Sequence, residues 1–81
     1  MDFPATAASP PERAALVEEV RRLRAAVEAL PEAHRMVVVL GELQGLPYAE
    51  VAEILDVPVG TVKSRMFVAL KKIHEILSAS K

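Results

Sequence analysis

Residues 48–67, YAEVAEILDVPVGTVKSRMF, decide how this chain folds. The apolar positions in the first half of this stretch have helical spacing and predict an amphipathic helix over residues 47–55. Pro58 cannot lie inside a helix, so a second helix must begin beside it at about residue 59, after a tight turn. Two helices joined in this way form a helix-turn-helix. In DNA-binding proteins this unit places the start of its second helix in the major groove.

The helix predicted over residues 59–78 has two different faces. We expect one face to be buried, because apolar residues repeat along it at helical spacing: Val62, Met66, Ala69, Ile73 and Ile76, with Leu70 and Leu77 at the margin. The opposite face is mostly polar or cationic and is the one that we expect to contact DNA: Gly60, Lys63, Ser64, Phe67, Lys71 and His74.

The residues of this polar face suit different parts of a DNA duplex. Gly60 permits close backbone approach, and Thr61 can bind a phosphate together with the free amides of the first turn. Lys63 and Ser64 can reach hydrogen-bond acceptors on base edges. The ring edge of Phe67 can contact the methyl group of a thymine.

The first part of the chain predicts one more long helix. Residues 1–8 are small and polar and are expected to form a disordered tail. The stretch Ser9-Pro10-Pro11-Glu12 fits a capping box that starts a helix over residues 10–30. This helix has a narrow apolar stripe, which we expect to pack on other helices of the domain or on a second protein: Leu16, Val20, Leu23, Val27 and Leu30.

A further helix is predicted over residues 31–44, between Pro31 as its first residue and Gly45 as a natural C-terminal stop. Its run of valines could form a strand by propensity alone, but the bracketing residues and the helical spacing favour a helix. Gly41 inside it costs about 0.5 to 1 kcal/mol relative to Ala. The prediction is therefore an all-α, compact four-helix domain over residues 9–81, with a C-terminal helix-turn-helix of the winged-helix-like type but without a wing.

Charge is distributed unevenly along the 81 residues. The net charge is −1, but residues 1–56 hold ten acidic and five basic side chains, whereas residues 57–81 hold five basic side chains against Glu75. Such asymmetry indicates that the second part binds an anionic partner. A solvated helix face is the alternative explanation.

Several classes of protein are excluded or disfavoured by composition. The chain has no cysteine, so it has no disulfide, thiolate metal site or cysteine nucleophile. We expect a cytoplasmic protein, because no apolar run is long enough for a membrane span and the start does not resemble a signal peptide. His34 and His74 have no nearby carboxylate or thiol at metal-ligand spacing. We expect no metal, no cofactor and no enzymatic activity.

Four strings of residues resemble one protein family: ALPE at 29–32, VVVLGELQGL at 37–46, YAEVAEIL at 48–55 and PVGTVKSR at 58–65. With their spacing, they make residues 12–77 similar to region 4 of the bacterial extracytoplasmic-function sigma factors. These proteins are the promoter-specificity subunits of RNA polymerase. The last string is specific for this family, and the ALPE entry distinguishes it from other helix-turn-helix proteins such as response regulators.

The resemblance implies a domain whose last helix reads the minus-35 element of promoters and whose body docks on the flap of the polymerase β subunit. By position, Lys63, Ser64 and Phe67 match DNA-contacting positions of the family, and Arg65 lies in the same basic string. A complete sigma factor also needs a region for the minus-10 element, for which 81 residues are too few. We therefore expect an excised domain, with a stand-alone sigma-like protein as the alternative.

Three positions depart from the family pattern. Pro47 stands where members often have Ser, and Asp56 where they often have Gly in the turn. Val68-Ala69-Leu70 stands where many members read Arg-Ala-Arg. Val68 thus removes a frequent phosphate or base contact, and each lost phosphate contact lowers the slope of log K against log salt concentration by about 0.9 on B-DNA. With fewer such contacts, we expect the isolated chain to bind DNA weakly.

Two functions use this fold. The first is promoter recognition with RNA polymerase, for which the DNA-binding residues are Gly60, Thr61, Lys63, Ser64, Arg65, Phe67 and Lys71. The second is a sigma-like interaction module that binds an anti-sigma factor or the β flap without reading DNA. Its candidate contacts are Leu16, Val20, Leu23, Val27 and Val68. In either case we expect no membrane contact and a monomer when free.

Overall fold

The computed structural model describes residues 10–79. Its elements are α1 (Pro10–Glu28), α2 (Glu32–Val38), the π-helical turn η2 (Val39–Leu43), α3 (Tyr48–Leu55) and α4 (Val59–Ala79). Within this range there is no strand, and the all-α prediction is confirmed. The disordered tail predicted for residues 1–8 and Ser9 of the capping box lie outside the described residues.

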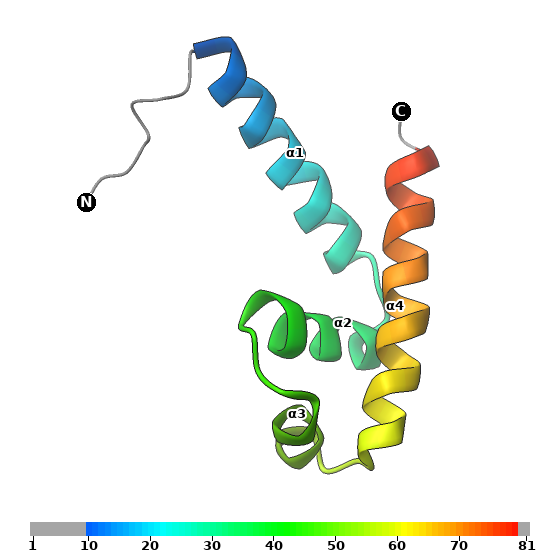
Figure 1. The fold of residues 1–81 in the computed structure, drawn as a ribbon. Helices are drawn as coiled ribbons and strands as arrows, with labels where there is room; N and C mark the ends of the chain where they lie inside the picture. The colour runs from blue at the N-terminus through cyan, green and yellow to red at the C-terminus, as the bar shows by residue number, and fades with distance from the viewer. Residues whose placement is uncertain (1–9, 80–81) are drawn as a thin grey trace, which may run out of the picture.

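The two long helices diverge at one end of the domain. Figure 1 shows α1 leaning away from α4 toward its N-terminal end, while α2 and α3 lie beside the first half of α4. One apolar core joins all of these elements where they meet, and it consists of Ala26, Val27, Leu30, Val37, Val38, Val51, Ala52, Val62, Met66, Ala69 and Ile73.

The junction between α1 and α2 is held by Arg35. The first helix ends at Glu28 rather than at Leu30 as the sequence predicted, because a residue before proline is disfavoured in helical conformation. The Arg35 Nη1 atom donates hydrogen bonds to the carbonyl oxygens of Leu30, at 3.1 Å, and of Glu28, at 3.4 Å. Carbonyl groups that the end of a helix leaves without partners are thus satisfied by a side chain of the next helix.

The last turn of the second helix is wider than predicted. Residues 31–44 were expected to form one ordinary helix, but residues 39–43 form a π-helical turn in which the amide of Gln44 donates to the carbonyl of Val39 at 2.9 Å. Gly41 lies in this turn, where an added Cβ would be 2.8 Å from Met66 Cε. The absence of a side chain at Gly41 therefore lets Met66 of α4 pack directly on the turn. Gly45 then ends the element at a φ of 74°, as its predicted role as a stop requires.

Candidate nucleic-acid interface

The turn of the helix-turn-helix occupies three residues, 56–58. Asp56 has left-handed backbone angles, φ 59° and ψ 49°, and the amide of the next residue, Val57, donates to the carbonyl of Ala52 at 3.0 Å. Glycine is the residue that adopts this conformation most easily, and Asp is one of the few others that tolerate it. The carbonyl of Pro58 then accepts the amides of Thr61 and Val62 and starts α4.

Burial of one face of α4 fixes how the helix is rotated. Four predicted core residues, Val62, Met66, Ala69 and Ile73, are buried at 8% exposure or less, whereas Ile76 and Leu77 are half-buried and Leu70 is exposed. Since the buried residues span three turns of the helix, α4 cannot rotate without exposing them to water. The opposite face must therefore point away from the domain.

This outward face carries most of the residues predicted to contact DNA. Exposed on it are Gly60, Lys63, Ser64, Phe67 and Lys71. Thr61 and Arg65 are half-buried and lie at its margins. An added Cβ at Gly60 would meet nothing within 4 Å, so no packing within the domain requires a glycine at this position. That is consistent with a position kept open for an external surface.

Two of these residues have internal hydrogen bonds that the sequence did not predict. The Ser64 hydroxyl donates to the carbonyl of Gly60 at 3.0 Å, so in this rotamer its oxygen can only accept a hydrogen bond from a base. The Thr61 amide donates to Pro58. Because Pro58 has no N–H, the amides of Val59 and Gly60 are the ones left to bind a phosphate at the start of α4.

The charge of α4 is positive over most of its length. Between Val59 and Lys72 the charged side chains are Lys63, Arg65, Lys71 and Lys72, and the first acidic residue after them is Glu75. The acidic residues Glu50 and Glu53 are exposed on α3 instead. The second helix of the unit is therefore the one that attracts a polyanion.

Other chemistry finds no support among residues 10–79. In this range no three histidine or acidic side chains are grouped so that they could hold a metal ion. No helix formed by the same residues combines the length and the apolar character that crossing a membrane requires.

The sequence pattern of the family described as "Sigma-70, region 4" matches residues 20–73, which include the helix-turn-helix and its core. The chain belongs to the sigma-70 region 4 family. It is 50% identical over 66 residues to the ECF RNA polymerase sigma-E factors of Escherichia coli (strain K12) and Salmonella typhimurium (strain LT2), which covers 80% of this chain and 35% of those proteins. The ECF RNA polymerase sigma-E factor of Haemophilus influenzae is 44% identical over 65 residues, which covers 79% of this chain and 34% of that protein. The chain thus spans about a third of the length of the curated relatives that it matches.

The positions where this region 4 domain departs from the family pattern fall into two groups. Pro47 serves as the N-cap residue of α3, where its carbonyl accepts the amides of Glu50 and Val51. Asp56 adopts the left-handed conformation that the turn needs. These two substitutions keep the backbone geometry. Val68 and Leu70 are instead 37% and 43% exposed on α4, so their effect falls on the surface and not on the fold.

A second surface of the region 4 domain is apolar. Leu16, Val20 and Leu23 of α1 are 58%, 57% and 41% exposed. Val27, also proposed from the sequence as a protein contact, is buried in the core at 6% exposure, and this part of the prediction is wrong. The stripe on α1 thus packs inside the domain only at its C-terminal end.

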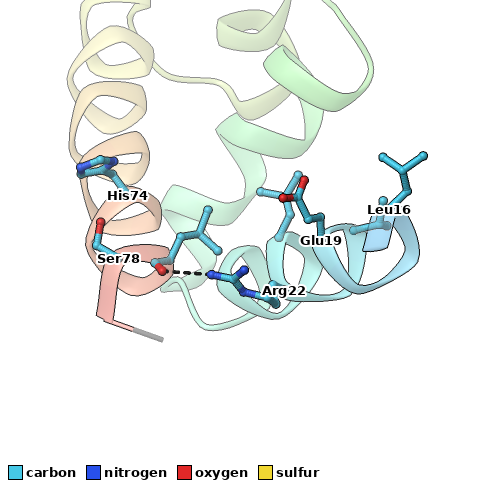
Figure 2. Close-up of a pocket in the computed structure, with 8 residues that line it drawn as sticks. Leu16, Glu19, Arg22, His74 and Ser78 are labelled. Atoms are coloured by element: carbon cyan, nitrogen blue, oxygen red, sulfur yellow. Dashed lines mark hydrogen bonds between the residues drawn. The ribbon is translucent and has the colours of Figure 1, made fainter. Parts of the chain in front are cut away.

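The exposed part of this stripe lines a groove of about 570 Å³ between α1 and the end of α4, formed by Leu16, Glu19, Val20, Arg22, Leu23, His74, Leu77 and Ser78. Figure 2 shows Arg22 bridging it, with Nη2 donating to the carbonyl of Leu77 at 3.2 Å. On the α2 side, a second hollow includes Leu43, which is 60% exposed. Leu43 was not recognised as a surface residue from the sequence, although its position just before the stop at Gly45 was a signal.

Proposed function

We propose that this region 4 domain recognises the minus-35 element of promoters through α4, as part of a sigma factor that directs RNA polymerase to start transcription. One observation carries the proposal. The outward face of α4 is cationic, has no acidic residue before Glu75 and is held in place by four buried residues on the opposite side. The names of the curated relatives support the assignment to a polymerase sigma factor.

The role of each residue on the outward face follows from its position along α4 and from the chemistry of its side chain. Lys63 and Phe67 lie in the first turns of α4 and are exposed, where recognition helices approach base edges. Arg65 at the margin and Lys71 further along suit phosphates, which position a protein without reading sequence. The Gly60 backbone suits a phosphate approached by the helix N-terminus.

Two lysines on α4 allow a direct test of DNA reading by this helix. Lys63→Ala removes a cation from the predicted reading face, and Lys72→Ala is its matched control, because Lys72 is equally a cation of α4 but was not predicted to contact DNA. We expect Lys63→Ala to weaken binding to a minus-35 duplex by about 1 to 3 kcal/mol. Fluorescence anisotropy at low salt measures both variants. Equal affinities for the two variants would remove Lys63 from the reading role.

The apolar groove beside α1 supports a protein partner in addition to DNA. We infer that the β flap of polymerase docks on the exposed part of this stripe, and that an anti-sigma factor competes for the domain. Val20→Glu places a charge in the groove and leaves the sequence of α4 unchanged. Retention of a purified flap fragment should fall in this variant, whereas binding to a minus-35 duplex should not change. A module that binds these partners without reading DNA is not favoured by the family assignment.

The remaining parts of the proposal follow from this role. The domain supplies binding and no catalysis, it acts in the bacterial cytoplasm together with polymerase, and it is a monomer when free. Light scattering on the purified chain tests the last point: a concentration-independent mass of 8.8 kDa is expected.

A further inference from the structure

Two apolar side chains interrupt the polar face of α4. Phe67 is 71% exposed and Val68 is 37% exposed. Single exposed apolar residues are ordinary on protein surfaces and need no explanation. These two are adjacent in the chain, and Phe67 lies in the part of α4 that the proposed function assigns to base edges.

The positions of their neighbours place this pair near the middle of the face. Ser64 lies three and four residues before the pair, and Lys71 lies three and four residues after it. Residues at these separations are neighbours on a helix surface. The four side chains therefore form a diamond, with a hydroxyl at one end, an ammonium at the other and an apolar group on each side. All four are exposed.

Charge around the pair favours DNA over a protein as the occupant. The ionisable side chains of α4 nearest in sequence are Lys63, Arg65, Lys71 and Lys72. A partner at this point must therefore combine negative charge with small apolar groups. The major groove does so at one base: thymine carries a methyl group at its C5 position, near the phosphates, whereas the other three bases carry no methyl group there.

We propose that Phe67 and Val68 together read thymine methyl groups, and that Val68 is a specificity-determining residue of this chain. This inference rests on the promoter-reading function proposed above. A valine cannot donate a hydrogen bond to guanine, which is the contact that arginine makes best. At the base step beside residue 68 the preference is therefore for thymine, and it depends on the methyl group alone.

The test begins with sites selected from random duplexes by the whole chain at low salt, where binding to DNA is strongest. Each thymine of the selected site is then replaced in turn by deoxyuridine, which removes only the methyl group. We expect one or two positions at which affinity falls about fourfold, the effect of one buried methylene (~0.8 kcal/mol). At these positions 5-methylcytosine should restore part of the affinity that cytosine loses.

Four variants, one of them a control, assign the methyl contacts to side chains. Val68→Ala should abolish the sensitivity to deoxyuridine at one position, and Phe67→Ala at the same or the adjacent position. Val17→Ala is the matched control, because Val17 is also an exposed valine, at 47%, but lies on α1; it should leave the sensitivity unchanged. Val68→Arg should change the preference at that position from thymine to guanine. Circular dichroism shows that each variant is folded.

The outcomes separate this inference from the proposed function. Specific binding with equal affinity for thymine and deoxyuridine at every position would overturn the reading of methyl groups while leaving promoter recognition intact. If Phe67→Ala and Val68→Ala retain DNA affinity but lose a polymerase fragment, the pair is a protein contact and the inference is wrong. If neither the chain alone nor the chain bound to RNA polymerase selects a site, the proposed function fails together with the inference.

Discussion

The two long helices of this domain, α1 with 19 residues and α4 with 21, use similar apolar stripes in different ways. In α4 the stripe is buried over Val62, Met66, Ala69 and Ile73. In α1 only Ala26 and Val27 are buried, and the first half of the stripe is exposed. The comparison shows that a stripe of the same kind orients one helix inside its own domain and leaves the other with an exposed apolar surface.

Met66 tests how firmly the domain holds α4. Met66→Ala should lower the free energy of unfolding by about 2 to 5 kcal/mol, because Met66 is buried at 2% exposure and packs against Gly41. Urea denaturation followed by circular dichroism measures the change. Met66→Leu conserves volume and should cost less than about 1.5 kcal/mol. If both variants lose the same free energy of unfolding, the shape of the methionine side chain, and not the apolar volume that it buries, dominates this contact.

Two valines on α1 test where its stripe leaves the core. Val27→Ala should cost about 1 to 3 kcal/mol, since it removes two buried methyl groups. Val20→Ala, the same change on the same helix at 57% exposure, should stay within about 0.5 kcal/mol. Thermal unfolding of both variants gives the comparison. A large loss at Val20 would show that the first half of α1 packs inside the domain after all.

Arg22 connects the two helices, and its removal should let them separate. Arg22→Gln should cost about 1 kcal/mol, because it removes a hydrogen bond to the carbonyl of Leu77 near the end of α4. Arg21→Gln is the control: its contact with Glu18 is at 3.8 Å between exposed side chains and contributes little. Hydrogen exchange of the last turns of α4 should rise in the first variant alone.

Gly60 gives the smallest effect on stability. Gly60→Ala should raise the free energy of unfolding by about 0.5 kcal/mol or less, because alanine favours a helix over glycine and an added Cβ meets nothing within 4 Å. Binding to a minus-35 duplex should fall nevertheless, since the methyl group holds the start of α4 away from the phosphates. A variant that binds DNA as well as the original chain would show that the backbone at Gly60 does not approach the duplex.

The orientation of α4 could be predicted from the sequence because its evidence is local. Pro58 requires a helix start, and the spacing of Val62, Met66, Ala69 and Ile73 defines one buried face. The exposure of the opposite face then follows from geometry alone. Gly45 was predicted as a stop for the same kind of reason, since its positive φ is a property of the single residue.

The remaining features depend on contacts that periodicity does not encode. The stripe on α1 predicted a buried or docking face, but how far the core extends along it is set by the divergence of α1 from α4 (Figure 1). The π-helical turn at 39–43 contains Gly41, on which Met66 packs from another helix. The hydrogen bond from Ser64 to Gly60 depends on a rotamer. None of these produces a pattern in neighbouring residues.

The left-handed residue Asp56 also marks the start of a short segment that joins α3 to the buried face of α4. Five residues separate Asp56 from Val62, the first buried residue of α4. Backbone hydrogen bonds hold this segment at both ends: the amide of Val57 donates to Ala52, and the amide of Val62 donates to Pro58. Because burial of Val62, Met66, Ala69 and Ile73 sets the rotation of α4, one residue inserted after Pro58 would lengthen the turn and leave Lys63 on the outward side. If α4 reads promoters as proposed, preference can therefore change through the outward side chains while the turn and the buried face stay the same.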